Sequence, residues 1–166
     1  MNRLLLVMGA ALLMLVLAMT RVSVRAQPEV EPLSAFPSSL LAVRTAAGNV
    51  INFKIWSADT PARDEQGLMF VRSMDLHAGM LFVFPKNQRV SMWMKNTYIP
   101  LDMLFMNQHG VIEYIAANAT PLSEAIIGPS TPEYAVLELN GGACARLGIK
   151  VGDTVLHGSF KTAKSP

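Results

Sequence analysis

A cluster of polar side chains between two apolar stretches is the part of this sequence best suited to chemistry. Lys95-Asn96-Thr97 follows residues 89–94, in which apolar and polar side chains alternate, and precedes a second apolar run. In an extended chain this alternation places Trp93 on the same face as Lys95. An indole beside an ammonium, an amide and a hydroxyl can stack a planar or sugar-like group and hydrogen-bond to it. The sequence therefore predicts a ligand-binding surface at Trp93, Lys95, Asn96 and Thr97.

An architectural role explains the same residues equally well. Trp93 can cover a sheet edge between solvated cationic side chains, while the polar groups close a tight corner by satisfying exposed backbone groups. Under this hypothesis the protein acts through contacts with other proteins. Its functional surface can then be the irregular connection at residues 117–133, which is rich in proline and glycine. A connection of this length in a compact domain is also a candidate lid.

Three charged side chains are candidates for orienting a ligand or for catalysis. Asp102 and Glu138 each lie in an otherwise apolar strand, where an unpaired buried charge is costly. If the two carboxylates approach each other, they can divide acid and base roles, as in hydrolases that act on sugars. Arg72 can hold a carboxylate or phosphate of a ligand, or pair with a carboxylate of the protein. We therefore take Arg72 and Asp102 as residues that orient the binding surface, and Asp102 with Glu138 as the catalytic pair of an alternative envelope hydrolase.

The spacing of the remaining cysteine, methionine and histidine residues does not predict a catalytic or metal-binding site. Phosphate-loop, dinucleotide-binding and serine-hydrolase motifs are absent from the sequence, so no cofactor is predicted and enzymatic activity stays open. Cys144 lies in a small-residue segment that predicts a buried thiol. Seven of the 11 methionines lie between residues 69 and 106, where thioethers invite a copper(I) hypothesis. Their positions in the apolar phase of strands favour core packing, and the isolated histidines give no metal site.

The N-terminal residues predict export. Residues 1–26 combine Arg3, an apolar run at residues 4–19, and small residues at the positions that a signal peptidase reads. The protein is thus expected to be periplasmic or extracellular. Alternatively, residues 4–19 stay as an anchor in the inner membrane, because the run is close to the lower limit for spanning a bilayer.

Removal of residues 1–26 changes the charge balance of the chain. It deletes three arginines and leaves 11 cations against 12 anions. This balance argues against nucleic-acid binding. The expected partner is a polar small molecule or a cell-envelope component, such as a carbohydrate. Membrane contact is expected only through the N-terminal segment if it is not cleaved.

The remaining residues predict one mainly β domain. A proline-rich linker is expected at residues 27–39, the domain at 40–158 and a flexible tail at 159–166. Asp59-Thr60-Pro61 is a helix-start signal, and Gly67 is expected to end this helix after about two turns. A second short helix is expected near Cys144. Strands are expected at residues 40–44, 50–56, 80–84, 89–94, 102–106, 111–116, 134–139 and 154–156. This pattern predicts a compact, jelly-roll-like β-sandwich or a flattened barrel with two short helices.

Several short motifs together resemble a known family. They are Gly67-Leu68-Met69, Arg72, Gly79-Met80-Leu81-Phe82-Val83-Phe84, Trp93-Met94-Lys95-Asn96-Thr97, Pro100-Leu101-Asp102-Met103, Leu137-Glu138-Leu139 and Gly152-Asp153. In this order they resemble the pattern of the bacterial and archaeal family called domain of unknown function number 192, over residues 40–158. The resemblance implies a compact, mostly β domain similar to a jelly-roll sandwich, and it implies no particular activity.

Overall fold

A single seven-stranded sheet forms most of the protein. The computed structural model describes residues 30–161 of the chain, so the predicted signal peptide or anchor at residues 1–26 lies outside the described residues. The strand order is β5-β4-β6-β3-β2-β1-β7, and only β2 and β3 pair in parallel. The strands are β1 (Ser38–Arg44), β2 (Val50–Ala58), β3 (Ala78–Arg89), β4 (Leu101–Met106), β5 (Ile112–Ala119), β6 (Pro132–Asn140) and β7 (Thr154–Leu156).

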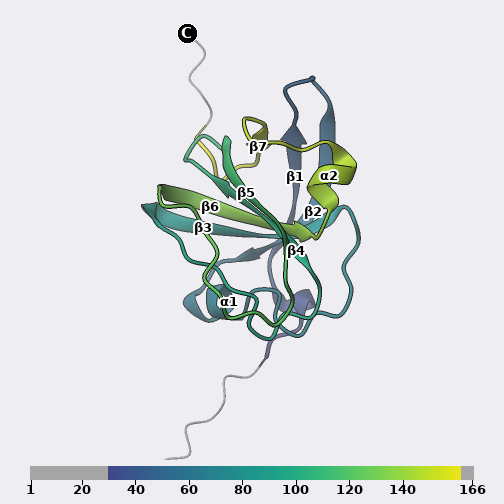
Figure 1. The fold of residues 1–166 in the computed structure, drawn as a ribbon, viewed down its shortest axis with the longest axis vertical. Coiled ribbons are helices and arrows are strands. Elements are labelled where there is room, and N and C mark those ends of the chain that lie inside the picture. Colours follow the sequence, from purple (N-terminus) through teal and green to yellow (C-terminus); the bar gives the residue numbers. More distant parts are fainter. Residues whose placement is uncertain (1–29, 162–166) are drawn as a thin grey trace, which may run out of the picture.

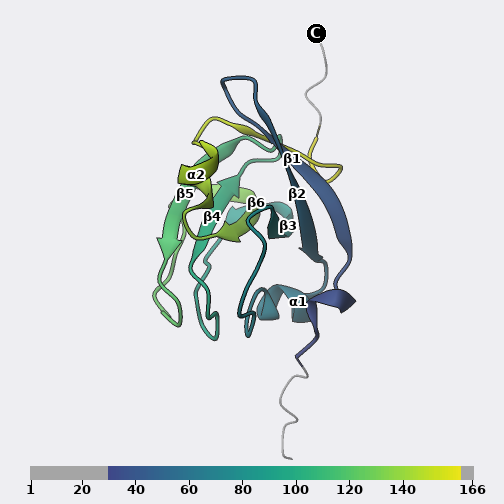
Figure 2. The ribbon, with the colours of Figure 1, turned by 90° about the vertical axis from the view of Figure 1, so that its right-hand side faces the viewer.

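The sheet curls until its two outer strands approach each other (Figures 1 and 2). An isolated bridge joins Val111 to Thr154, and the Val155 N–H donates a hydrogen bond of 2.8 Å to the Gly110 carbonyl. The two helices are short, α1 (Pro61–Gln66) and α2 (Ala143–Leu147). The predicted mainly β fold with two short helices is therefore confirmed, and its form is one curled sheet that makes a half-barrel.

Alternation along the strands divides the buried side chains into two cores. The first core lies inside the curl and receives side chains from all seven strands, for example Leu137 of β6. The second lies on the outer face of β3, β4 and β6 and includes Met80, Met103 and Val136. Loops cover this outer core, and α1 lies at the same end of the molecule (Figure 2). A side chain's sequence parity within a strand therefore decides which core it enters.

Local sequence signals fix both ends of α1, the helix that forms one wall of the site. The Thr60 hydroxyl oxygen accepts a hydrogen bond of 3.3 Å from the Arg63 N–H, and Pro61 occupies the first helical turn. Gly67 ends the helix with a φ of 49°, which is a conformation that glycine adopts at little cost. The helix start and stop predicted from the sequence are confirmed.

Residues 90–97 do not form the strand that the sequence predicts at 89–94. Strand β3 ends at Arg89, and beyond it Met92 makes only an isolated bridge with Ile127. The expected alternation of faces nevertheless holds, because Met94 is fully buried whereas Trp93 is 39% exposed. Because Met92 pairs with the loop residue Ile127 and not with a strand of the sheet, the chain turns away from the sheet after Arg89.

The segment predicted as a free linker packs on the domain from Val30 onward. Arg63 of α1 forms an ion pair of 3.0 Å with Glu31, and Phe36 is buried in the outer core. At the other end Phe160, predicted to belong to the flexible tail, enters the inner core. The composition of these two terminal segments predicts only that they are extended. It does not show that they pack on the domain, because the residues they contact are distant in the sequence.

Gly110 gives a stability prediction for the closure of the curl. Its φ is 75°, and an added Cβ would lie 2.3 Å from the carbonyl oxygen of Val155. Gly110→Ala is expected to lower the free energy of unfolding by about 2 to 3 kcal/mol, from overpacking added to backbone strain. Gly48 has a φ of 86° with no atom near its added Cβ, so Gly48→Ala should cost only about 1 kcal/mol. Urea unfolding of both variants measures the difference, and equal losses would show that the close approach at Gly110 is unimportant.

Candidate functional site

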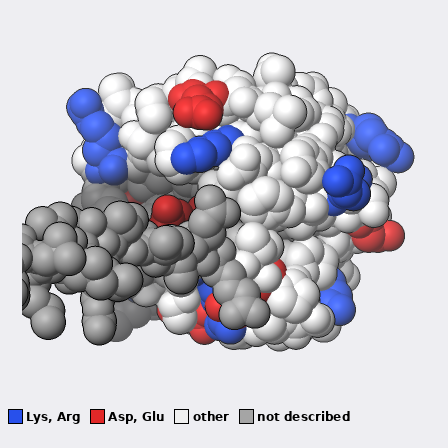
Figure 3. All heavy atoms as spheres, turned by 90° about the horizontal axis from the view of Figure 1, so that it is seen from below, with Lys and Arg blue, Asp and Glu red and all other residues white. Residues whose placement is uncertain are grey.

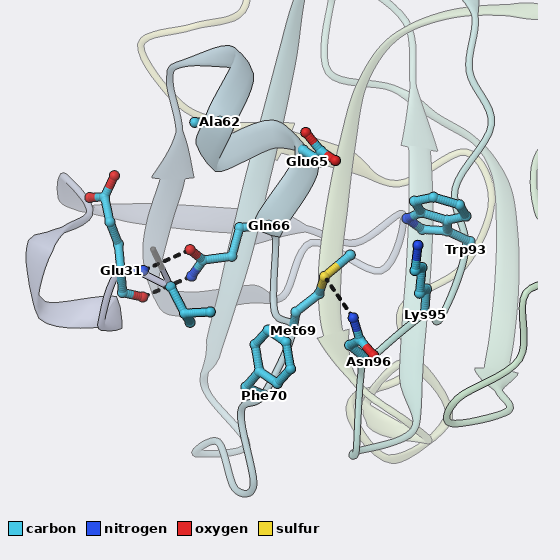
Figure 4. A pocket seen from close by; sticks show the side chains of 10 residues that line it. Glu31, Ala62, Glu65, Gln66, Met69, Phe70, Trp93, Lys95 and Asn96 are labelled. Atoms are coloured by element: carbon cyan, nitrogen blue, oxygen red, sulfur yellow. Dashed lines mark hydrogen bonds between the residues drawn. The ribbon is translucent and has the colours of Figure 1, made fainter. Parts of the chain in front are cut away.

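A pocket of about 430 Å³ lies between α1 and the Trp-Met-Lys-Asn-Thr segment (Figure 4). One wall comes from the end of α1 and the residues after it, and the other from residues 93–96. Segments that are about 30 positions apart in the sequence thus face each other. The side chains that line it include those of Glu65, Gln66, Met69, Phe70, Trp93, Lys95 and Asn96.

Trp93 and Lys95 present a combined aromatic and cationic surface to this pocket. The Lys95 ammonium lies 5.0 Å from the centroid of the Trp93 ring, within the range of a cation–π contact. Glu65 projects from the opposite wall (Figure 4). The expected placement of Trp93 beside Lys95 is thus confirmed, and the binding of a ligand there stays a prediction.

Strained backbone joins the two walls. Phe70 and Asn96 adopt positive φ angles of 66° and 55°, and the Phe70 N–H donates a hydrogen bond of 2.8 Å to the Asn96 carbonyl. The Asn96 side-chain amide lies 3.8 Å from the sulfur of Met69. A bulky residue such as Phe at positive φ is rare, and such strain is concentrated at functional sites. This arrangement holds Phe70 at the pocket with its side chain 40% exposed.

A second, narrow cavity of about 30 Å³, which we call the niche, adjoins the pocket and reaches Glu138. It shares Glu65, Gln66, Met69, Trp93 and Lys95 with the pocket, and Thr97 also lines it. Glu138 is only 3% exposed. Burial raises the pKa of its carboxyl from an ordinary value of 4.5 to about 8, so the group is mainly protonated at neutral pH.

Asp102 lies away from the pocket and stabilises the start of α2. Its Oδ1 accepts hydrogen bonds of 2.8 and 2.9 Å from the N–H groups of Asn118 and Gly142, and its Oδ2 accepts one of 2.9 Å from the Cys144 N–H. The carboxylate is completely buried. The prediction that Asp102 orients the ligand-binding surface is therefore wrong, since backbone N–H groups use its hydrogen-bonding capacity.

The paired-carboxylate hypothesis is also wrong in its geometry. Asp102 is opposite Leu139 in the pairing of β4 with β6, and Glu138 is opposite Met103. Successive residues of a strand point to opposite faces, so Asp102 enters the inner side of the sheet and Glu138 the outer side. The two carboxyl groups share no cleft, and they cannot divide acid and base roles on one substrate.

Arg72 and the connection at residues 117–133 also differ from their predicted roles. The Arg72 guanidinium carbon lies 4.9 Å from the centroid of the Tyr98 ring, and Arg72 lines neither the pocket nor the niche. The connection binds the Trp-Met-Lys-Asn-Thr segment through backbone hydrogen bonds, such as that of 2.9 Å from the Met94 N–H to the Ser123 carbonyl. No residue from 117–133 lines either cavity, so the connection supports the segment and does not cover the pocket.

The cysteine and most of the methionines that the sequence offered as reactive or metal-binding groups lie in positions typical of core packing. Cys144 is buried, and burial together with the nearby Asp102 carboxylate raises the pKa of its thiol, which disfavours the nucleophilic thiolate. Met80, Met94, Met103 and Met106 are fully buried, which confirms core packing for these four methionines. Among residues 30–161, no three His, Cys, Asp or Glu side chains gather as metal ligands would. The described part of the chain also holds no helix that is long and apolar enough to cross a membrane.

Sequence reasoning missed the wall contributed by α1 and the N-terminal segment. Gln66 exchanges hydrogen bonds of 2.8 and 2.7 Å with the backbone N–H and carbonyl of Glu31, which closes one side of the pocket (Figure 4). The available signal was the Gly67-Leu68-Met69 motif directly after the helix. Its proximity to the Trp-Met-Lys-Asn-Thr segment depends on tertiary structure, and no spacing in the sequence indicates it.

Comparisons with known proteins concern the family and the fold of this chain. A search of the curated proteins finds no match. A solved protein of Sinorhizobium meliloti 1021, described provisionally as a transcription regulator, is 45% identical; the match covers 73% of this chain and 94% of that chain, with a TM-score of 0.72. A protein of unknown function from Novosphingobium aromaticivorans DSM 12444 is 38% identical. That match covers 80% of this chain and 94% of that chain, with a TM-score of 0.72. The profile of DUF192, a family described as uncharacterised ACR, matches residues 42–157. These residues are more than half of the chain, which therefore belongs to the DUF192 family.

Proposed function

We propose that this protein is an exported binding domain whose pocket takes a polar ligand containing a saccharide. The observation that carries the proposal is the pocket of about 430 Å³ at the Trp-Met-Lys-Asn-Thr segment. Its volume lies within the range of small-molecule sites. It is large enough for a sugar ring with substituents, and too small for a folded partner.

The chemistry of the walls favours a ligand with both apolar and polar faces. Trp93 offers an aromatic face, and the exposed Phe70 ring lines the same pocket. Lys95, Asn96 and Glu65 supply donors and acceptors of hydrogen bonds around these rings. Sugars present C–H groups on one face and hydroxyl groups at their edges, so they match such a combination. The hydrogen bond between Phe70 and Asn96 holds the two walls in register before the ligand arrives.

Electrostatics support a small polar ligand in preference to a nucleic acid. The description of the Sinorhizobium meliloti protein names transcription regulation. On the face of this protein shown in Figure 3, however, Lys and Arg side chains are scattered among acidic ones and do not form a basic stripe. Without residues 1–26 the chain has 11 cations and 12 anions. Neither observation favours binding to phosphates along a duplex.

Thermal melting in the presence of defined sugars tests the proposal. Melting of the purified protein is followed with N-acetylglucosamine, its oligomers, glucose and muramyl dipeptide. A ligand at 100 times its Kd should stabilise the fold by about 2.7 kcal/mol, which raises Tm by several degrees. Trp93→Ala and Lys95→Ala are expected to abolish this shift while Tm of the free protein changes by less than about 2 °C.

Lys54 provides a matched control for Lys95. Its ammonium lies 6.0 Å from the centroid of the Trp56 ring on β2, and neither residue lines the pocket or the niche. Lys54→Ala should therefore keep the full ligand-induced shift. A shift that survives in Trp93→Ala and Lys95→Ala would contradict the proposed site. If no sugar raises Tm of any of these proteins and Lys95→Ala melts early, the results would favour the architectural role of the Trp-Met-Lys-Asn-Thr segment.

A further inference from the structure

Glu138 differs from the other buried carboxyl groups of the described chain. The carboxylates of Asp102 and Asp153 accept backbone hydrogen bonds. Glu133 accepts one of 2.9 Å from the Thr131 hydroxyl at Oε1, although its buried Oε2 has no partner among the described residues. Within residues 30–161, no hydrogen bond or ion pair reaches the Glu138 carboxyl, and burial is the only influence that shifts its pKa. Because it lines the niche, the Glu138 carboxyl is free to form a hydrogen bond with a group that enters there.

The surroundings of Glu138 explain why its own chain provides no partner. Its neighbours across the ladder are Met80 on β3 and Met103 on β4, whose thioethers donate no hydrogen bond. Met69 and Met92 line the niche together with Glu138. Charged side chains line it as well, namely Asp64, Glu65 and Lys95, and the niche opens beside the pocket described above.

We propose that Glu138, as a neutral carboxylic acid, donates a hydrogen bond to an uncharged carbonyl oxygen of the N-acetyl type that enters the niche. This inference rests on the proposed saccharide-binding function of the pocket, and it specifies the sugar substituent that the niche recognises. The niche volume of about 30 Å³ has room for one small group and excludes a ring. An acetamido group supplies a methyl that can contact Met69 and Met92 and a carbonyl oxygen that can accept a hydrogen bond from the acid.

The charges at the niche favour an uncharged substituent. Asp64 and Glu65 face it from α1, and Lys95 faces it from residues 90–97. An anionic substituent would meet the Asp64 and Glu65 carboxylates, and a cationic one would meet the Lys95 ammonium and lose its hydration. A neutral carbonyl avoids both costs. Because burial raises the pKa of Glu138 to about 8, the acid keeps its proton at neutral pH and is available as a donor.

Titration of N-acetylglucosamine and of glucose, followed by NMR of the ¹⁵N-labelled protein, tests the inference. The wild type should bind N-acetylglucosamine about tenfold more tightly than glucose at pH 6.5, as one well-placed hydrogen bond provides. Glu138→Met should bind both sugars equally, with glucose affinity unchanged. Glu138→Gln keeps an amide donor and should keep the preference. At pH 9 the preference should fall in the wild type and persist in Glu138→Gln.

The outcomes separate the role of Glu138 from the function of the pocket. Binding of both sugars without preference, or a preference that survives in Glu138→Met, would overturn the role of Glu138 and leave the pocket as a sugar site. Absence of binding of either sugar to the wild type would overturn both proposals. Native-like amide spectra of Glu138→Met and Glu138→Gln verify that a lost preference does not arise from unfolding.

Discussion

Asp102→Ala is expected to lower the free energy of unfolding by about 3 to 5 kcal/mol. The substitution leaves the N–H groups of Asn118, Gly142 and Cys144 without their acceptor, and each unsatisfied buried donor costs about 1 to 3 kcal/mol, partly offset where water enters. The loss also frees the start of α2, which has no other side-chain cap. Denaturant unfolding measures the change.

Two further substitutions make this prediction specific. Asp102→Asn keeps an oxygen that can accept the two hydrogen bonds made to Oδ1, but it loses the hydrogen bond made to Oδ2. This substitution should therefore lower the free energy of unfolding by only about 1 to 2 kcal/mol. Asp75 also accepts a backbone hydrogen bond of 2.8 Å, from His77, but it is exposed. Asp75→Ala should therefore cost less than about 1 kcal/mol. Similar losses in Asp102→Ala and Asp75→Ala would refute the structural role assigned to Asp102.

Stability is expected to fall as the pH rises from about 5 to 8 because of Glu138. Its pKa is about 8 in the folded protein and near the ordinary 4.5 in the unfolded chain. Between these values the folded state binds one more proton than the unfolded state, so the free energy of unfolding decreases with pH. A shift of this size corresponds to about 5 kcal/mol over the whole window, as an upper bound.

Glu138→Gln isolates this contribution. The amide does not ionise, so the variant should match the wild type near pH 4 and exceed its stability increasingly up to pH 8. Burial also raises the pKa of Glu133 and Asp64, and it lowers that of His157, but these groups are present in both proteins. The difference between the two unfolding curves therefore reports Glu138 alone. A difference that does not change between pH 5 and pH 8 would show that Glu138 has an ordinary pKa.

The sequence by itself determined the class of fold and most of the elements. The alternation of apolar residues, the cap at Thr60 and the glycine at position 67 act locally, so they could be read without knowledge of the partners. The same alternation placed Trp93 and Lys95 on an exposed face beside each other. The motifs from Gly67-Leu68-Met69 to Gly152-Asp153 were sufficient to indicate the family.

Only the tertiary structure decided which of these residues meet. The curl of the sheet and the packing of α1 bring Gln66 and Phe70 to Trp93, and no local pattern encodes a contact across about 30 positions. Strand pairing placed Asp102 and Glu138 on opposite faces, because a shift of one position in register reverses the face of a side chain. The apolar pattern showed that both carboxyl groups would be buried. Asp102 meets three backbone donors and Glu138 lines the niche, and both environments depend on chain segments that are distant in sequence.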